Sequence, residues 1–214
     1  MMKKHLENTL YSWPKSFIRD SDLAILLPGS IDARFSLIKR AMKEDKLLPL
    51  RRGLYLINKP YSNTLPDLFE IAQLIYGPSY ISLESALAYH HWIPEAVYTT
   101  TSVSFKRNVL FNTPIGQFHF SYVPNENFYM GVERIETEEA VFLIGSAWKA
   151  LADCVYVYRK SWVNLEDMME DLRIEPESLK QEGRDTLTTL ALQYPSKRVR
   201  IFLMNISQEL SNWI

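Results

Sequence analysis

The stretch from Asp20 to Ile57, which reads DSDLAILLPGSIDARFSLIKRAMKEDKLLPLRRGLYLI, decides the fold that we predict for this chain. Ser21 can cap a short helix, and Pro28-Gly29 ends it, because proline and glycine interrupt helices. Ser30 can cap a second helix, which fades into Leu47. The stretch therefore begins with two short helices joined by a turn.

Two short apolar runs follow these helices, and a basic turn joins them. The runs are Leu48–Leu50 and Leu54–Ile57, and the turn is Arg51-Arg52-Gly53. Glycine permits positive φ in a tight hairpin turn, so the two arginines are expected at its tip. Two helices followed by a basic hairpin are the elements of a winged helix-turn-helix, and we predict that fold for residues 1–60.

The second helix divides into an apolar side and a polar side when its residues are spaced at about 100°. The apolar side has the spacing of a buried stripe and consists of Ile31, Phe35, Ile38 and Met42. The other side and its flanks carry Ala33, Arg34, Ser36, Lys39, Arg40 and Lys43. An ordinary surface helix would also show this division. The capped helix before it and the basic hairpin after it favour a DNA-recognition helix.

The predicted DNA-binding residues come from this helix and from the hairpin: Arg34, Ser36, Lys39, Arg40, Lys43, Arg51 and Arg52. Ser36 and Arg40 would face the edges of bases, and the other helical residues would contact phosphates. The hairpin arginines would reach the adjacent groove or the backbone. The expected partner is double-stranded DNA.

The charge is distributed unevenly along the chain. Residues 1–60 hold 12 Lys+Arg against 6 Asp+Glu, a balance of +6, whereas residues 61–214 hold 12 against 19, a balance of −7. Their sum is the formal net charge of −1. A basic N-terminal segment joined to an acidic remainder suits a module that faces nucleic acid and a second part with another task.

The composition is that of a globular protein, with 47% hydrophobic and 23% charged residues and a single cysteine, Cys154. One cysteine excludes a disulfide within the chain, which suits the reducing cytoplasm, and no signal peptide is visible. The most apolar stretch, 140–158, contains Lys149 and Asp153, so we expect a strand followed by a buried helix and no membrane span. We therefore expect a cytoplasmic protein.

The remaining residues, 61–214, are predicted to form a mixed α/β domain with an antiparallel sheet and a helical C-terminal tail, so that the whole chain belongs to the α+β class. The turn-rich segment Lys59–Asn63 marks the expected boundary. Ser82 can cap the helix that follows it. The segment from Val97 to Phe142 is strand-like, and helical spacing returns at Ala147.

Four motifs occur in an order that resembles one protein family. They are RRGLYLI at 51–57, YISLESALAYHHWIPE at 80–95, TPIGQFHF at 113–120 and GSAWKALADCVY at 145–156. This order resembles the AbiEi family of antitoxins and transcriptional regulators from bacterial abortive-infection, or type IV toxin–antitoxin, systems. The family pattern has a glycine after the histidine of the second motif, where this chain has His91-Trp92.

The resemblance implies an N-terminal winged helix that represses its own operon by binding inverted repeats in the promoter, with two copies of the chain on the DNA. It also implies a C-terminal domain that neutralises a partner toxin of the nucleotidyltransferase type. The implied function is that of a transcriptional autorepressor with antitoxin activity in phage defence.

The sequence offers few candidates for catalysis. The adjacent His90-His91 would point about 100° apart on a helix, and His119 stands alone on a strand, so no metal-binding spacing joins the histidines. Gly145-Ser146 followed by Asp153 is similar to the start of a nucleotidyltransferase site, but Val155 stands where a second carboxylate is needed. We expect no enzyme, metal or cofactor, and we interpret Asp153 as a structural hydrogen-bonding residue.

Two other functions stay open at this point. The chain could be a protein-interaction module without DNA binding, anchored by exposed aromatic residues among Trp92, Tyr98, Phe128 and Tyr129. The acidic helical face at 166–171 could meet a basic partner, although such runs are usually solvated surface. A nuclease with a DNA-binding head would need clustered acidic residues and lysines, which the strand region does not show convincingly.

Overall fold

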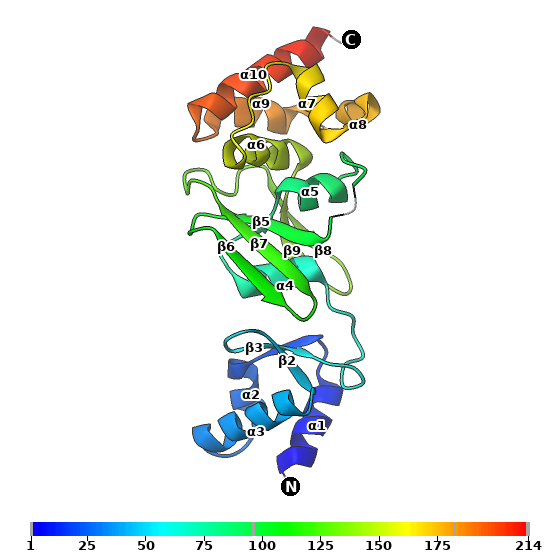
Figure 1. The fold of residues 1–214 in the computed structure, drawn as a ribbon, viewed down its shortest axis with the longest axis vertical. Coiled ribbons are helices and arrows are strands. Elements are labelled where there is room, and N and C mark those ends of the chain that lie inside the picture. Colours follow the sequence, from blue (N-terminus) through cyan, green and yellow to red (C-terminus); the bar gives the residue numbers. More distant parts are fainter. Residues whose placement is uncertain (1, 96, 182, 213–214) are drawn as a thin grey trace.

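The computed structural model describes residues 2–95, 97–181 and 183–212 as an elongated molecule (Figure 1). A unit of three helices and a small sheet lies at the N-terminal end, a larger sheet lies in the middle, and helices form the other end. The two termini therefore lie at opposite ends of the long axis. No helix in the described ranges has the length and hydropathy required to cross a membrane.

The N-terminal unit, residues 2–57, contains the predicted pair of helices and the hairpin. Its elements are α1 (Met2–Ser12), β1 (Phe17–Arg19), α2 (Asp20–Leu26), α3 (Ile31–Lys43), β2 (Leu47–Arg51) and β3 (Leu54–Ile57). The three strands form an antiparallel sheet in the order β1-β3-β2. The helix pair is thus enclosed by strands that precede and follow it in the chain.

The two predicted helix caps have different outcomes. Ser30 caps α3 as predicted, since its Oγ accepts a hydrogen bond from the backbone N of Ala33 at 3.3 Å. The prediction for Ser21 is wrong, because α2 already begins at Asp20. The Asp22 carboxylate instead accepts a hydrogen bond from the backbone N of Arg19, at 2.9 Å, at the start of the helix.

The buried side of α3 differs from the predicted stripe. Leu37, Ile38 and Ala41 are buried in the core of the N-terminal unit, whereas Ile31 is 77% exposed and Phe35 is 66% exposed. The prediction was wrong for these last two residues because the apolar residues cover a wide arc, and periodicity alone does not decide which edge turns inward. Packing against α2 and β2 selects the edge that carries Leu37 and Ala41.

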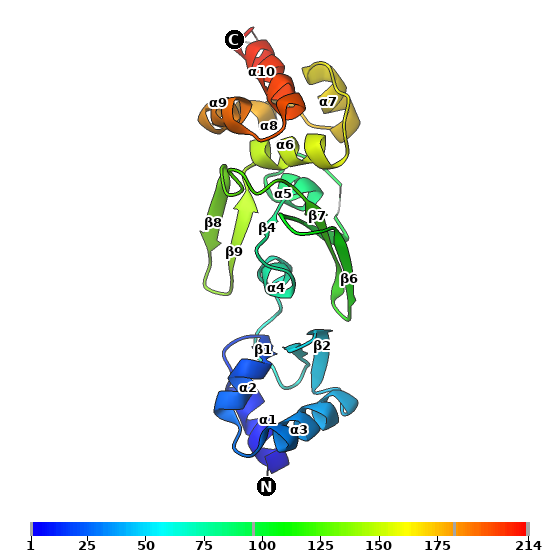
Figure 2. The ribbon, with the colours of Figure 1, turned by 90° about the vertical axis from the view of Figure 1, so that its left-hand side faces the viewer.

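The middle of the molecule is a six-stranded sheet, with α4 (Leu68–Ile75) between its two outer hairpins (Figure 2). The strands are β4 (Tyr80–Ile81), β5 (Thr99–Ser104), β6 (Val109–Thr113), β7 (Gly116–Tyr122), β8 (Val132–Glu136) and β9 (Val141–Gly145), in the order β6-β7-β5-β4-β9-β8. The prediction of an antiparallel sheet is only partly correct, because β5–β7 and β4–β9 are parallel pairs. β6 serves as the return strand, which lets β7 run beside β5 in the same direction.

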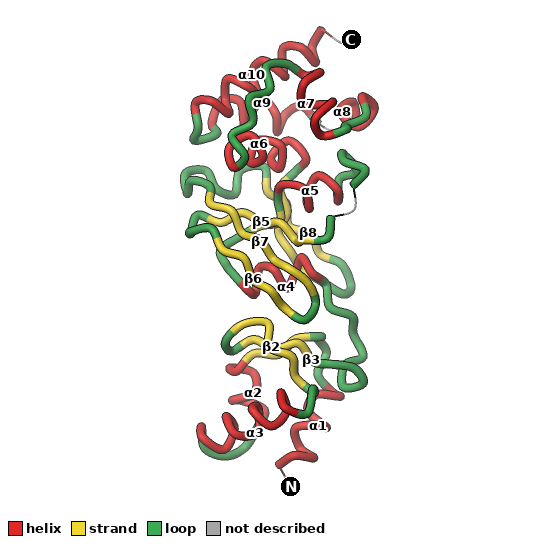
Figure 3. Tube along the Cα trace, in the orientation of Figure 1, coloured by secondary structure: helices red, strands yellow, loops and turns green. Residues whose placement is uncertain are grey.

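Helices make up the rest of the chain, and they alternate with short loops beyond the sheet (Figure 3). They are α5 (Leu83–Tyr89), α6 (Ala147–Val157), α7 (Leu165–Leu172), α8 (Pro176–Gln181), α9 (Arg184–Gln193) and α10 (Lys197–Asn212). The predicted helical tail is therefore confirmed. α6 lies between the sheet and the outer helices, and its residues from Ala147 to Val155 are all buried.

The small N-terminal sheet is buried on both faces. Tyr55 and Ile57 belong to the core beneath the three N-terminal helices, whereas Phe17, Leu54 and Leu56 belong to the core of the larger unit. Strands covered on one face alternate between apolar and polar residues, so double burial explains the unbroken apolar run of β3. The sheet thereby packs the N-terminal unit against the middle of the molecule.

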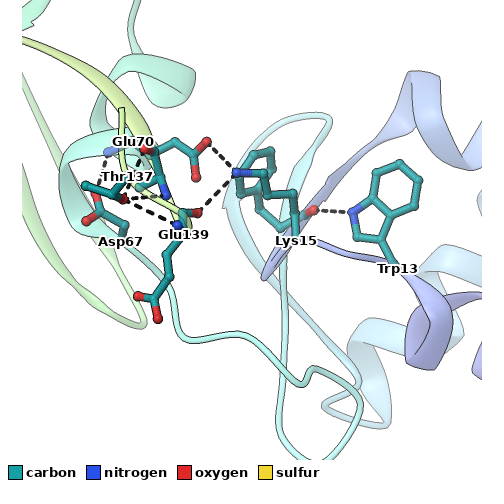
Figure 4. A network of polar contacts seen from close by, with 8 residues as sticks. Trp13, Lys15, Asp67, Glu70, Thr137 and Glu139 are labelled. Atoms are coloured by element: carbon teal, nitrogen blue, oxygen red, sulfur yellow. Dashed lines mark hydrogen bonds and ion pairs between the residues drawn. The ribbon is translucent and has the colours of Figure 1, made fainter. Parts of the chain in front are cut away.

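A polar contact accompanies this apolar one (Figure 4). Lys15 follows α1 in the chain. Its ammonium donates to Oε1 of Glu70 in α4 at 3.0 Å and to the backbone O of Glu139 at 3.2 Å. Part-exposed ion pairs contribute at most about 1 kcal/mol, whereas each fully buried leucine contributes about 2 kcal/mol. The apolar sheet face, with Leu54 and Leu56, therefore contributes most to the stability of this packing. The hydrogen bonds of Lys15 help to fix the orientation of the two units.

A buried polar network joins the sheet to the helical tail. Oδ2 of Asp153, in α6, accepts hydrogen bonds from the Tyr80 hydroxyl at 2.8 Å and from Oγ of Ser82 at 2.7 Å. Its Oδ1 accepts one from the Tyr194 hydroxyl at 2.9 Å and lies 3.2 Å from Nζ of Lys149. The structure thus agrees with the interpretation of Asp153 as a structural residue.

The network explains why Ser82 does not cap α5 with its side chain. Ser82 occupies the N-cap position, but its Oγ is turned toward Asp153 and makes no capping hydrogen bond. Burial, and then the Asp153 carboxylate, raise the pKa of Tyr80 and of Tyr194 well above the usual phenol value, so both hydroxyls stay protonated and donate. The charge of Lys149 is the counterpart that permits a fully buried carboxylate here.

We expect the Asp153→Asn variant to lower the free energy of unfolding by about 3 kcal/mol, because it leaves the buried Lys149 ammonium without its counter-charge. Urea denaturation followed by tryptophan fluorescence measures this loss. Asp171→Asn is the matched control, since it removes a carboxylate from a more exposed pair with Lys160 and should cost less than about 1 kcal/mol. Equal losses in the two variants would contradict a stabilising role for the network.

Candidate nucleic-acid interface

The exposed side of α3 brings together four of the predicted DNA-binding residues: Ser36, Lys39, Arg40 and Lys43. They lie opposite the buried Leu37, Ile38 and Ala41. In the part of the chain that the structure describes, none of the three basic side chains makes an ion pair. Their charges therefore face solvent and are available to a polyanion.

Arg34 lies apart from these residues. Its guanidinium NH1 donates to the backbone O of Gly29 at 2.5 Å, in the turn between α2 and α3, and the side chain is partly buried. It lines a hollow of about 300 Å³ between the two helices, together with Asp20 and Phe35. The structure thus places the Arg34 guanidinium at the turn between α2 and α3 and not on the exposed basic side of α3.

Arg51 and Arg52 are exposed at the turn between β2 and β3, as the sequence predicts. Gly53 has a φ of +76°, and its backbone O accepts a hydrogen bond from the backbone N of Asp20 at 3.0 Å. The turn is therefore fastened to the first residue of α2. Burial first, and then a hydrogen bond with Asp20, raise the pKa of Tyr55 to about 12, which keeps this phenol neutral beside the turn.

Two lysines that contribute to the positive net charge of residues 1–60 form ion pairs within the protein. Lys46 is buried after α3, where its Nζ lies 2.5 Å from Oε1 of Glu7 and 2.6 Å from Oε2 of Glu44. Hydrogen bonds to these two carboxylates raise the pKa of Lys46 above its usual value, so the ammonium persists despite burial. Lys15 is used in the contact with Glu70. The interface is therefore less basic than the composition alone indicates.

Three large apolar side chains of α2 and α3 are exposed, which periodicity alone does not predict. Ile25, Ile31 and Phe35 are 84%, 77% and 66% exposed. Large apolar side chains exposed next to one another often mark a binding surface. The sequence does signal them, because Ile31 and Phe35 lie one helical turn apart, but the same spacing also describes a buried stripe.

Comparison with protein-family models and with curated proteins finds no match for this chain. The order of motifs that resembles the AbiEi family thus stays a prediction from the sequence. One position of the second motif, His91, has an unusual backbone conformation.

His91 has a φ of +59°, at the end of α5, in the left-handed region that glycine favours. The backbone N of His91 donates to O of Ala88 at 3.1 Å, and that of Trp92 donates to O of Leu87 at 2.8 Å. These two bonds form a Schellman motif, which ends a helix through a residue with positive φ. His91 therefore ends α5 in a conformation that glycine would adopt more readily.

The histidines and aromatic residues that the sequence offers as other candidates do not form one site. Nε2 of His90 makes a hydrogen bond with the backbone O of Gly145 at 2.9 Å, and His119 lies on β7. No group of three or more potential metal ligands is found within the described residues. Of the proposed aromatic anchors, Trp92 and Phe128 are buried, which corrects that prediction, whereas Tyr98 and Tyr129 are exposed.

Replacing Gly53 by alanine should lower the free energy of unfolding by about 1–2 kcal/mol, because an L-residue resists positive φ. A Cβ at this position would also lie 3.1 Å from Oδ2 of Asp20. Gly183→Ala is the control, since Gly183 has a φ of −61° and no heavy atom within 4 Å of the added Cβ. Urea titration of both variants gives the comparison, and an unchanged Gly53→Ala midpoint would contradict the required turn geometry.

Proposed function

We propose that the protein binds double-stranded DNA through a winged helix formed by its N-terminal unit, with α3 as the recognition helix and the β2–β3 turn as a short wing. The observation that carries this proposal is the exposed side of α3, where Lys39, Arg40 and Lys43 have no internal partners among the described residues. A helix packed on one side, basic on the other and held by a second helix is how helix-turn-helix proteins enter the major groove.

The proposed contacts follow from the positions of these side chains. Arg40 and Ser36 read base edges, and Lys39 and Lys43 contact the phosphates on either side. Arg51 and Arg52 contact the adjacent groove or the backbone from the wing. Arg34 is left out of this set, because its guanidinium already holds the turn at Gly29.

Phe35 and Ile31 extend the proposed interface. They lie beside the basic side of α3 and are too exposed to serve the core. In the major groove the thymine methyl is the one apolar group on a base edge, and phenylalanine is among the residues that contact it. We therefore propose that Phe35 contributes a preference for thymine next to the base that Arg40 reads.

We propose further that the DNA is the protein's own promoter and that the chain acts as the antitoxin of a type IV toxin–antitoxin system, in the cytoplasm, against a nucleotidyltransferase toxin. The order of the four sequence motifs supports this part of the proposal. Two copies of the chain bind the two halves of an inverted repeat, as the symmetry of such sites requires.

A second candidate function is a protein-interaction module, and the exposed Ile25, Ile31 and Phe35 favour it. Ile31 and Phe35 border the hollow of about 300 Å³ between α2 and α3, which is large enough to accept one apolar side chain of a partner. In this case the basic residues of α3 would steer the partner and would not read DNA.

The first test is fluorescence anisotropy with DNA from upstream of the gene against scrambled DNA, at two salt concentrations. We expect Arg40→Ala to lose about 1–3 kcal/mol on the upstream DNA, mainly at one base position, and Lys43→Ala to weaken both DNAs and reduce the salt slope by about 1. Arg107→Ala is the matched control, because Arg107 is an exposed arginine in the larger unit. Identical affinities of wild type for both DNAs, or no binding, would contradict sequence-selective recognition.

The second test concerns Phe35. Replacing thymine by uracil in the bound site removes only the methyl group, and we expect it to cost the wild type about 1 kcal/mol of binding free energy at the contacted position. Phe35→Ala should show the same loss on thymine DNA and no further loss on uracil DNA. An unchanged uracil penalty in Phe35→Ala would assign the methyl contact to another residue, and Leu192→Ala, on the exposed surface of α9, serves as the control.

A further inference from the structure

The larger unit contains a pocket of about 700 Å³, far along the chain from the basic helix. Its floor is the surface of the sheet, where Thr101, His119 and Leu110 lie side by side on β5, β7 and β6. The helical tail forms another wall, through Leu172 of α7. The volume falls within the range of small-molecule binding sites, about 300–1,000 Å³.

The walls of the pocket combine apolar and aromatic side chains with one carboxylate. Ile93, Val97 and Leu172 provide the apolar surface, and the rings of Tyr98 and Tyr158 are exposed at the pocket. Glu84, in the first turn of α5, is partly buried. Among the described residues, neither lysine nor arginine lines this pocket.

Glu84 differs from the two other carboxylates at the pocket. Oε1 of Glu95 lies 3.2 Å from NH1 of Arg173, and Oδ2 of Asp171 lies 2.5 Å from Nζ of Lys160, so both are neutralised. Within the described chain, Glu84 has a neutral partner only, the Tyr158 hydroxyl, which donates to its Oε2 at 3.0 Å. Glu84 is thus a carboxylate in a largely apolar pocket that has no ion-pair partner among the described residues.

The hydrogen bond from Tyr158 leaves half of this carboxylate free. Burial, and then the charge of Glu84, raise the pKa of Tyr158 well above the usual phenol value, so the hydroxyl remains a donor. Oε1 of Glu84 therefore keeps its capacity to accept from a ligand. A single carboxylate is too few ligands for a calcium or magnesium ion, and anions would be repelled by its charge.

We propose that this pocket binds a small organic cation, in which an amine or guanidinium on an apolar or aromatic body pairs with Glu84. The ammonium lies against the free Oε1 and beside the rings of Tyr98 and Tyr158, because cations are attracted to aromatic faces. The apolar body fills the space over Leu110 and between Ile93 and Leu172. The site is independent of the proposed DNA interface, so either can fail without the other.

The test uses the full chain and three probes of nearly the same shape: 2-phenylethylamine, 2-phenylethanol and phenylacetate. We follow their binding by isothermal titration and by amide shifts in ¹H–¹⁵N NMR spectra. A ligand of this size should bind with a Kd on the order of 1 mM. We expect the amine to bind at least about tenfold more tightly than the alcohol, the acid not to bind, and the shifts to centre on residues 99–101 and 117–119.

Three variants identify the counter-ion. Glu84→Gln keeps an acceptor for Tyr158 and should abolish the difference between amine and alcohol. Tyr158→Phe keeps the carboxylate and should retain the difference, and Glu166→Gln, an exposed residue of α7 away from the pocket, is the control.

The proposal is overturned by the absence of saturable amine binding at concentrations about tenfold above the expected Kd, or by unchanged selectivity in Glu84→Gln. It is also overturned if N-acetylarginine amide binds more tightly than every small amine tested. That result would assign the pocket to an arginine side chain of a partner protein and not to a free cation.

Discussion

The larger unit depends on one buried charge pair. Lys149 and Asp153 lie one turn apart in α6, and both are removed from solvent, where an isolated charge would be strongly destabilising. The carboxylate is satisfied only because two other segments donate to it, one with Tyr80 and Ser82 and the other with Tyr194. Correct assembly of the sheet, α5, α6 and the end of α9 is thus a condition for burying this charge.

The position of α6 also determines where the neighbouring elements of the larger unit lie. With α6 fixed between the sheet and the outer helices, the first turn of α5 is held where Glu84 faces the pocket. On the other side of the sheet, α4 receives the apolar face of the N-terminal sheet and the ammonium of Lys15. The two candidate binding regions therefore lie on different units with separate cores, and the basic region is at the far N-terminal end.

Much of the fold follows from local signals in the sequence. Three residues act locally and were predictable: Ser30, the glycine of the hairpin turn and Asn164. Oδ1 of Asn164 accepts a hydrogen bond from the backbone N of Asp167 at 2.8 Å. The exposure of Ile31 and Phe35 and the parallel strand pairs were not, because they depend on which distant surface each element meets. Ser82 shows the limit most clearly, since a tertiary hydrogen bond to Asp153 replaces its expected capping bond. The pocket combines residues from five elements and has no local signal.

Double burial of the small sheet limits how this protein can be recombined. A winged helix on a free linker can be moved between proteins as a module, because its outer surface is already polar. Here the outer sheet face carries Phe17, Leu54 and Leu56, which the larger unit covers. A hybrid chain joined near residue 60 would leave these side chains in water, so the N-terminal unit can be altered only by substitution on the exposed side of α3, or exchanged together with α4.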